Sequence, residues 1–324
     1  RCLVQSLITT LAPKTLMTNV SQTIPFPEHH DINPRWHWKN FMDIFMTFLT
    51  AIICLFGLVG NGIVIWLLGF QIKRNSFTTY VLNLAVADSG VLIFLFLWGI
   101  KEICRYFRIY IQDYDLAFFL FGLMYCIGQL FLTAISIDRC ASILFPIWHR
   151  CRRPPHLSTT ICALIWVSCS LLGGLHRILL NMPSIRTDIS HYLFALLSLV
   201  CLPLMIVSSL TLLIKVSQRS RQQRRGKLLS AILFALFFFL VFASPFTVIY
   251  ILTKLYNFHF NFDLRYFALL CSSVNSSVNP LIYFLVGRNR RGQSRESMKV
   301  ILQKVFKEEE EPGEHLELRV QSQL

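Results

Sequence analysis

Seven long stretches of this chain are almost free of charged side chains, and they constrain its fold more than any other feature. Asp88 is the one charged residue inside these stretches, which run over 44–72, 75–100, 116–137, 154–176, 189–214, 228–253 and 266–287. Each stretch holds 22 to 29 residues, and a helix needs about 20 apolar residues to cross a bilayer. Only 15% of the chain is charged, against roughly a quarter in soluble proteins. The sequence therefore predicts an all-α integral membrane protein, a bundle of seven transmembrane helices.

Lysine and arginine are distributed unevenly over the predicted loops. The loops after the first, third and fifth stretches carry eleven of them besides Arg139, and the other three loops carry seven. Because short positively charged loops stay in the cytoplasm, we expect an extracellular N-terminus and a cytoplasmic C-terminus in the plasma membrane. The net charge of +14 then forms a basic rim against membrane lipid. No basic patch is interleaved with aromatic residues in a soluble part of the chain, so nucleic acid is not an expected partner.

The seven stretches divide the chain into four parts. These are an extracellular N-terminal segment, a seven-transmembrane domain, an amphipathic cytoplasmic helix and a disordered tail, at residues 1–40, 41–287, 288–306 and 307–324. The short eighth helix is predicted because Met298, Ile301 and Val305 recur at helical spacing, which is typical of helices that lie on a membrane surface.

The N-terminal segment carries one candidate modification site. Asn19 begins the sequence Asn-Val-Ser, an acceptor for N-glycosylation if this end is outside. Met17 lies just before it. We hypothesise that Met17 is the true start and that residues 1–16 belong to an extended gene prediction.

Metal binding and enzymatic chemistry are not indicated by the residues present. Eight of the ten cysteines lie within or beside the apolar stretches, where cysteine behaves as a small buried apolar residue. No pair of cysteines has the C-x-x-C spacing of a zinc site. No nucleophile and base, metal cluster or phosphate-binding loop lies outside the predicted bilayer, so we expect neither an enzyme nor a metal site.

Polar residues inside the apolar stretches are the first candidates for function. An amide or carboxylate is costly in lipid, so Asn61 and Asp88 must face the interior of the bundle, and we expect each to supply a partner for the other. Asp88 is a candidate cation site or protonation switch. Pro203, Pro245 and Pro280 each remove a helix hydrogen bond in one of the last three stretches, which favours helices that pivot.

An acidic and a basic residue, Asp138-Arg139, come directly after the third stretch, and the basic run that ends at Arg153 follows. Taken in order with Asn61, Asp88, Trp166, the later prolines and the sequence NPLIY at 279–283, this pattern resembles the rhodopsin-like (class A) G-protein-coupled receptors. Within that class the stretches 57–77, 133–154, 208–216 and 276–287 are most similar to Mas-related receptors. The resemblance covers about residues 41–306.

The resemblance implies roles for individual residues and for a partner. Asp138-Arg139 corresponds to the cytoplasmic switch, in which Arg139 pairs with Asp138 at rest and turns toward a heterotrimeric G protein, of Gq or Gi type, on activation. Pro203, Pro245, Asn279, Pro280 and Tyr283 correspond to the moving parts of the later helices. The residues that correspond to the class A sodium pocket are Asn61, Asp88, Asn275, Ser276 and Asn279. Gly128 stands where many relatives have a hydroxyl, which removes one sodium ligand.

The outer face departs from the usual pattern of the class. Tyr114 replaces the cysteine at the top of the third span, the loop 177–190 contains no cysteine, and Ala243 replaces a tryptophan. These departures imply a shallow, open pocket for an extracellular peptide or small molecule. The candidate ligand contacts are Glu102, His176, His191, Asp188 and Tyr250. His176 and His191 correspond to positions near the outer ends of spans four and five where some Mas-related receptors carry acids, so the resemblance disfavours a polybasic ligand.

Two other functions remain open from the sequence. A seven-span transporter or channel would use Asp88 as its ion or proton site, although no internal repeat accompanies it. Most class A receptors join the top of the third span to the second outer loop by a disulfide. A receptor-fold protein that lacks this disulfide would alternatively be a non-signalling decoy. The last residues, Ser322-Gln323-Leu324, have the spacing of a PDZ-binding terminus.

Overall fold

The computed structural model describes residues 34–72, 75–109, 114–180 and 264–287, together with separate positions between 197 and 252. The chain divides into the units Arg1–Asn40 and Phe41–Leu324, and every contact below lies within the second unit. Asn19, the predicted eighth helix at 288–306 and the tail at 307–324 lie outside the described residues.

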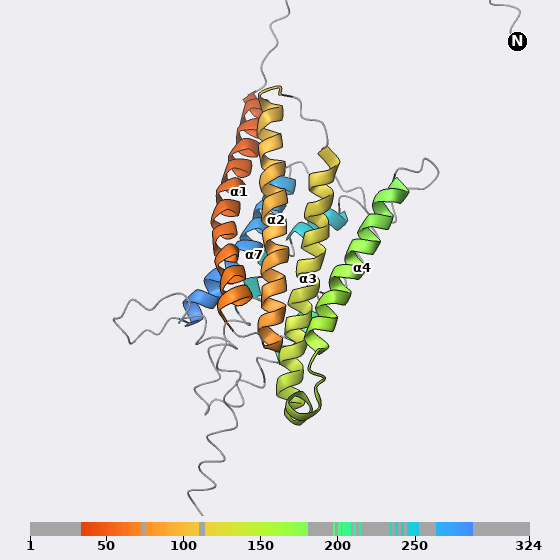
Figure 1. Ribbon diagram of the computed structural model, residues 1–324. Coiled ribbons are helices and arrows are strands. Elements are labelled where there is room, and N and C mark those ends of the chain that lie inside the picture. The colour runs from red at the N-terminus through yellow and green to blue at the C-terminus, as the bar shows by residue number, and fades with distance from the viewer. Residues whose placement is uncertain are drawn as a thin grey trace, which may run out of the picture. The chain divides into compact units, whose positions relative to one another are not determined.

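The described chain is helical throughout its long segments (Figure 1). The helices are α1 (Pro34–Trp66), α2 (Ser76–Tyr106), α3 (Tyr114–Leu144), α4 (Leu157–Leu180) and α7 (Leu264–Gly287), with π-helical turns η1 (Leu67–Gln71) and η2 (Trp148–Arg152). Every described residue within 197–214 and 234–252 is also helical. The helices overrun the predicted apolar stretches by several residues because a helix does not end where the hydrocarbon ends.

Four of the described helical segments are long and apolar enough to cross a membrane. They are Phe41–Gln71, Ser76–Tyr106, Leu116–Leu144 and Leu157–Leu175. The remaining long helix, α7, is less apolar because it buries Ser272, Ser273, Asn275, Ser276 and Asn279. Many large apolar side chains of the described helices are exposed instead, among them Phe56 of α1 at 76% and Leu171 of α4 at 68%. Such a surface is stable against lipid and places the polar groups between helices.

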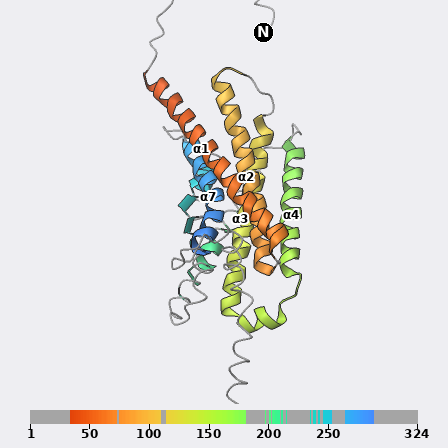
Figure 2. The same cartoon turned by 60° about the vertical axis from the view of Figure 1, so that its left-hand side comes forward.

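Helix α2 is the element that most of the others contact. It packs against α3, α4 and α7, and α4 in turn packs against α3 (Figures 1 and 2). Its first turn is closed by a capping box, in which Thr78 N donates to Asn75 Oδ1 at 2.8 Å and Asn75 N donates to Thr78 Oγ1 at 2.8 Å. Farther along, Trp166 Nε1 of α4 donates to Asn83 Oδ1 of α2 at 2.9 Å.

Glycines allow two of the helix pairs to approach closely. A Cβ on Gly90 of α2 would lie 2.7 Å from Met124 Cγ of α3. A Cβ on Gly57 of α1 would overlap the side chain of Ser277 on α7, whose hydroxyl donates to the Ile53 carbonyl at 3.2 Å. Small residues at such contacts are the usual means by which membrane helices pack without a hydrophobic driving force.

Candidate functional site

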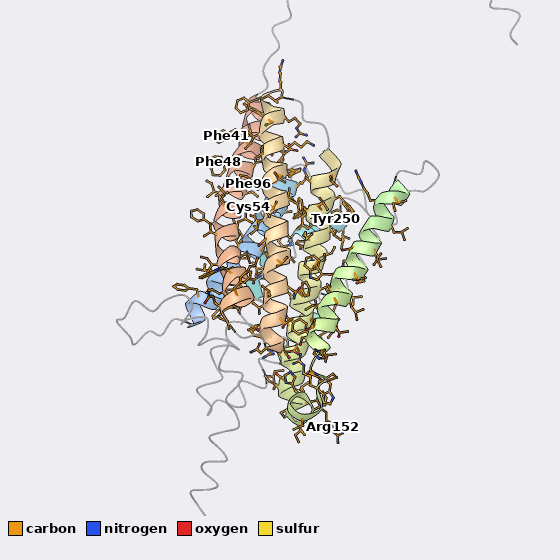
Figure 3. All side chains as sticks on the ribbon, viewed as in Figure 1. Phe41, Phe48, Cys54, Phe96, Arg152 and Tyr250 are labelled. Carbon is orange, nitrogen blue, oxygen red and sulfur yellow. The ribbon has the colours of Figure 1, made fainter. Side chains whose placement is uncertain are left out.

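The charge pair predicted at the end of the third span lies in the last turns of α3. Arg139 Nη2 donates to Asp138 Oδ2 at 2.6 Å, and the two side chains are 6% and 9% exposed. The Arg139 guanidinium also lies over the ring of Phe77, 4.5 Å from its centroid. Arg139 is therefore held inward, between a carboxylate on its own helix and an aromatic face on α2. Figure 3 places Arg152, from the adjoining turn η2, at the opposite end of the helices from Phe41.

A second set of polar residues reaches the same carboxylate from the segment that joins α3 to α4. Arg153 Nη2 lies 2.7 Å from Asp138 Oδ1, and it donates to Ser158 Oγ of α4 at 2.7 Å. His149 Nε2 lies 2.6 Å from Arg153 Nη1 and 3.6 Å from Asp138 Oδ1. Sequence reasoning treated Arg153 only as part of a basic rim, since nothing in the spacing of the residues shows that it turns back toward α3.

The polar centre of the bundle joins α1, α2 and α7. Asp88 is 3% exposed, and Asn279 Nδ2 donates to its Oδ2 at 2.8 Å. Ser276 forms a further side-chain hydrogen bond with Asp88. Asn61 is 1% exposed and donates to the carbonyls of Gly57 and Ser276, each at 3.0 Å. Its donors thus meet backbone carbonyls of α1 and α7 and not Asp88, the partner expected from the sequence.

The groups around Asp88 offer few ligands for a sodium ion. The carboxylate and the Ser276 hydroxyl are oxygen donors, but Asn279 turns its N–H group toward the carboxylate. Gly128 is the part of α3 that faces Asp88, and a Cβ there would lie 3.8 Å from Asp88 Oδ1. Because glycine has no side-chain oxygen, α3 adds no side-chain ligand at this point. Among the described residues, no group of three or more His, Cys, Asp or Glu side chains is placed to hold a metal ion.

The other residues predicted to move on activation lie on different helices. Pro280 stands inside α7 and approaches α1, where a Cβ on Gly60 would lie 3.2 Å from Pro280 Cβ. Tyr283 is buried one turn farther along α7, and Asn275 is buried nearer its start. Pro203 is exposed and Pro245 is half-buried, and each lies at a helical position.

An aromatic cluster that the sequence did not predict links α3 to residues 246–250. Phe121 and Tyr125 of α3 meet the ring of Phe246 edge to face, with centroids 5.2 and 5.0 Å away. Below this cluster, the Tyr125 hydroxyl lies 3.3 Å from Thr247 Oγ1, and Gln129 Nε2 donates to the same oxygen at 3.5 Å. Tyr250, a candidate ligand contact that Figure 3 labels, packs on Phe246. The centroids of the two rings are 5.9 Å apart. A ligand that displaced Tyr250 would therefore disturb the contact between α3 and residues 246–247.

Of the remaining candidate ligand contacts, the structure describes the side chain of Glu102, near the end of α2. Glu102 is 7% exposed; it pairs with Arg105 and accepts a hydrogen bond from the Tyr266 hydroxyl of α7 at 3.3 Å. Its carboxylate therefore joins the ends of α2 and α7. His176 belongs to α4, but its side chain, His191 and Asp188 lie outside the described residues. The nine cysteines in the described part of the chain form no disulfide.

Comparison with known proteins agrees with this architecture. The family described as 7 transmembrane receptor (rhodopsin family) matches residues 60–283. The chain is 36% identical to the proto-oncogene Mas of Mus musculus over 95% of its own length and 94% of the relative's. It is 41% identical to Mas-related G-protein coupled receptor member H of Rattus norvegicus over 80% and 83% of the two chains. For member D of Macaca fascicularis the identity is 37% over 81% and 85%.

These matches confirm the seven-transmembrane fold class, and they extend over the helices that carry the two polar clusters. They leave the transporter or channel alternative without support, because the matched family consists of receptors. The chain therefore belongs to the Mas-related, rhodopsin-family G-protein-coupled receptors: it is a multi-pass plasma-membrane protein of a receptor family that couples in general to heterotrimeric G proteins, and it is not an enzyme.

Proposed function

We propose that an extracellular peptide or small molecule binds in a shallow outer pocket, and that Arg139 then turns away from Asp138 toward a G protein of Gq or Gi type. The observation that carries this proposal is the buried pair at the end of α3, where Arg139 Nη2 and Asp138 Oδ2 are 2.6 Å apart. A charge pair that can exchange its partner biases a two-state helix bundle. The proposal also requires the C-terminus and the α3–α4 segment to be cytoplasmic.

The outer pocket in this proposal is bordered by Glu102, Tyr250, His176, His191 and Asp188. Tyr250 supports the connection from this pocket to the switch, because its ring rests on Phe246 and Phe246 rests on α3. Movement of α3 against residues 246–247 would then carry ligand binding to the other end of the helix. Sodium at Asp88 has no part in the proposal, and a PDZ contact through Ser322-Gln323-Leu324 is a separate expectation.

The test is a panel of G-protein dissociation sensors in cells, with and without a library of small peptides and metabolites. We expect a wild-type signal from one Gq- or Gi-type sensor and its loss in Arg139→Ala. Arg152→Ala is the matched control, because Arg152 lies in the adjoining turn η2 with its side chain exposed. Surface expression of each variant is measured with an epitope tag.

Silence of the wild type under every condition, at normal surface expression, would support the decoy alternative. A signal that survives Arg139→Ala would overturn the role given to Arg139. Loss of the signal in Arg152→Ala as well would mean that basic charge in general, and not the paired arginine, supports coupling.

A further inference from the structure

Asp138 holds two guanidinium groups at once, one on each oxygen of its carboxylate. Arg139 Nη2 lies 2.6 Å from Oδ2, and Arg153 Nη2 lies 2.7 Å from Oδ1. The side chains of Asp138 and Arg153 are 9% and 7% exposed. Removing the only partner of a charge buried to this degree is strongly unfavourable. A second partner lowers that cost, because the carboxylate of Asp138 stays paired when one of its two guanidinium partners leaves.

Arg153 is held in place by contacts that do not involve Arg139. It donates to Ser158 Oγ at 2.7 Å, and its Nη1 lies 2.6 Å from His149 Nε2. Because a guanidinium only donates hydrogen bonds, His149 Nε2 is the acceptor in this contact. The same nitrogen lies farther from Asp138 Oδ1, at 3.6 Å, than from Arg153 Nη1.

The backbone adds to this placement. Arg153 ends η2 in an extended conformation, with φ −70° and ψ 127°. Pro154 follows it, and the residue before a proline is restricted to extended conformations because the proline ring clashes with the helical one. Arg153 is therefore held beside Asp138 by side-chain contacts and backbone geometry that do not involve Arg139.

We propose that Arg153 is a positioning residue of the switch, which keeps Asp138 paired while Arg139 moves away. A carboxylate between two guanidinium groups leaves one net positive charge, so each arginine also weakens the hold of Asp138 on the other. Arg153 thus favours release of Arg139 in two ways. This inference deepens the proposed function and rests on it where it concerns signalling.

The first test is a cycle of thermal unfolding measurements on the purified full-length receptor, which needs neither ligand nor G protein. Arg153→Gln is introduced into the wild type and into Arg139→Ala. With Arg139 absent, Arg153 is the remaining guanidinium on Asp138, so we expect Arg153→Gln to lower Tm about twice as much in that background, as coupled neighbours do. Arg152→Gln serves as the control and should lower Tm in neither background.

Equal losses of Tm in the two backgrounds would overturn the inference, because they would mean that Arg153 acts only through Ser158 and His149. If Arg153→Gln does not yield folded receptor, Ser158→Ala replaces it in the same cycle. That variant keeps every charge and removes one contact that holds Arg153, so a smaller difference of the same sign is expected.

The second test measures ligand-independent nucleotide exchange on the G protein identified by the sensor panel. We expect Arg153→Gln to reduce exchange about tenfold, the size of coupling between neighbouring groups, and Arg153→Lys to retain most of it. In an Asp138→Asn background no carboxylate holds Arg139, so Arg153→Gln should leave the rate of nucleotide exchange unchanged. An equal reduction in that background would overturn the inference. The unfolding measurements can show coupling between Arg153 and Arg139 while Arg139→Ala leaves signalling unchanged. That combination would overturn only the proposed function.

Discussion

At the scale of single residues, the buried carboxylate of Asp88 determines what its neighbours must be. A charged or polar group in the interior of a membrane protein is costly unless other groups pair with it. The Asn279 amide supplies a donor at 2.8 Å, and the hydroxyl of Ser276 supplies another. The Ser276 carbonyl meanwhile accepts from Asn61 at 3.0 Å. One turn of α7 therefore satisfies polar groups from both α1 and α2.

Replacement of Asn279 by alanine is expected to destabilise the receptor. The change removes the amide donor from Asp88 and leaves the carboxylate with one fewer hydrogen bond, at a cost of about 1–3 kcal/mol. The measurement is thermal unfolding of purified receptor. In an Asp88→Asn background the cost should be smaller, because the charge is gone, and an equal cost in both backgrounds would mean that Asn279 acts mainly through packing.

At the scale of elements, the packing of α1 on α7 depends on glycine at specific positions. Gly57 faces Ser277 and Leu92, and Gly60 faces Pro280. Gly62 is on the same helix, but a Cβ there would meet nothing within 4 Å. The three glycines thus have different surroundings although their intrinsic effect on a helix is the same.

This difference predicts opposite results for two identical substitutions in α1. Gly57→Ala forces a methyl group into Ser277 and Leu92, so it should cost about 1–3 kcal/mol of stability, as overpacking does. Gly62→Ala gains helix propensity without a clash and should leave Tm unchanged or slightly raised. Thermal unfolding of the two variants side by side is the measurement. Equal Tm values would contradict the close contact between α1 and α7.

At the scale of the whole molecule, the distribution of basic residues sets the expected orientation. The pair Asp138-Arg139 and the basic residues around η2 lie at the opposite end of the helices from Phe41, as Figure 3 shows for Arg152. An extracellular N-terminal end would therefore place the switch where a G protein can reach it. The same orientation would expose Asn19 to the glycosylation machinery.

Orientation is tested by epitope tags at the two ends of the chain. Antibody should stain an N-terminal tag on intact cells and a C-terminal tag only after permeabilisation. An Asn19→Gln variant should lose the mass that an endoglycosidase removes from the wild type. Staining of the C-terminal tag on intact cells would reverse the orientation, whereas an unchanged mass with correct staining would exclude only glycosylation at Asn19.

The sequence by itself determined the fold class and the position of the main charged groups. Charged residues are costly inside a bilayer, so the gaps between them mark the spanning segments without reference to any contact. For the same reason Asp88 and the pair Asp138-Arg139 were recognisable as candidates: an isolated charge in an apolar stretch needs an explanation wherever its partners lie.

Only the tertiary structure decided which groups meet. Asn279 is 191 residues from Asp88, Ser276 is 215 residues from Asn61, and Thr247 is 122 residues from Tyr125. Helix rotation and packing place these side chains opposite one another, and no local pattern reports that rotation. Arg153 was visible as one of several basic residues, but its contact with Asp138 depends on the turn η2 and the extended backbone before Pro154. Hydrophobic spacing determines that a segment crosses the membrane, whereas the partner of a polar side chain depends on the three-dimensional packing of distant segments.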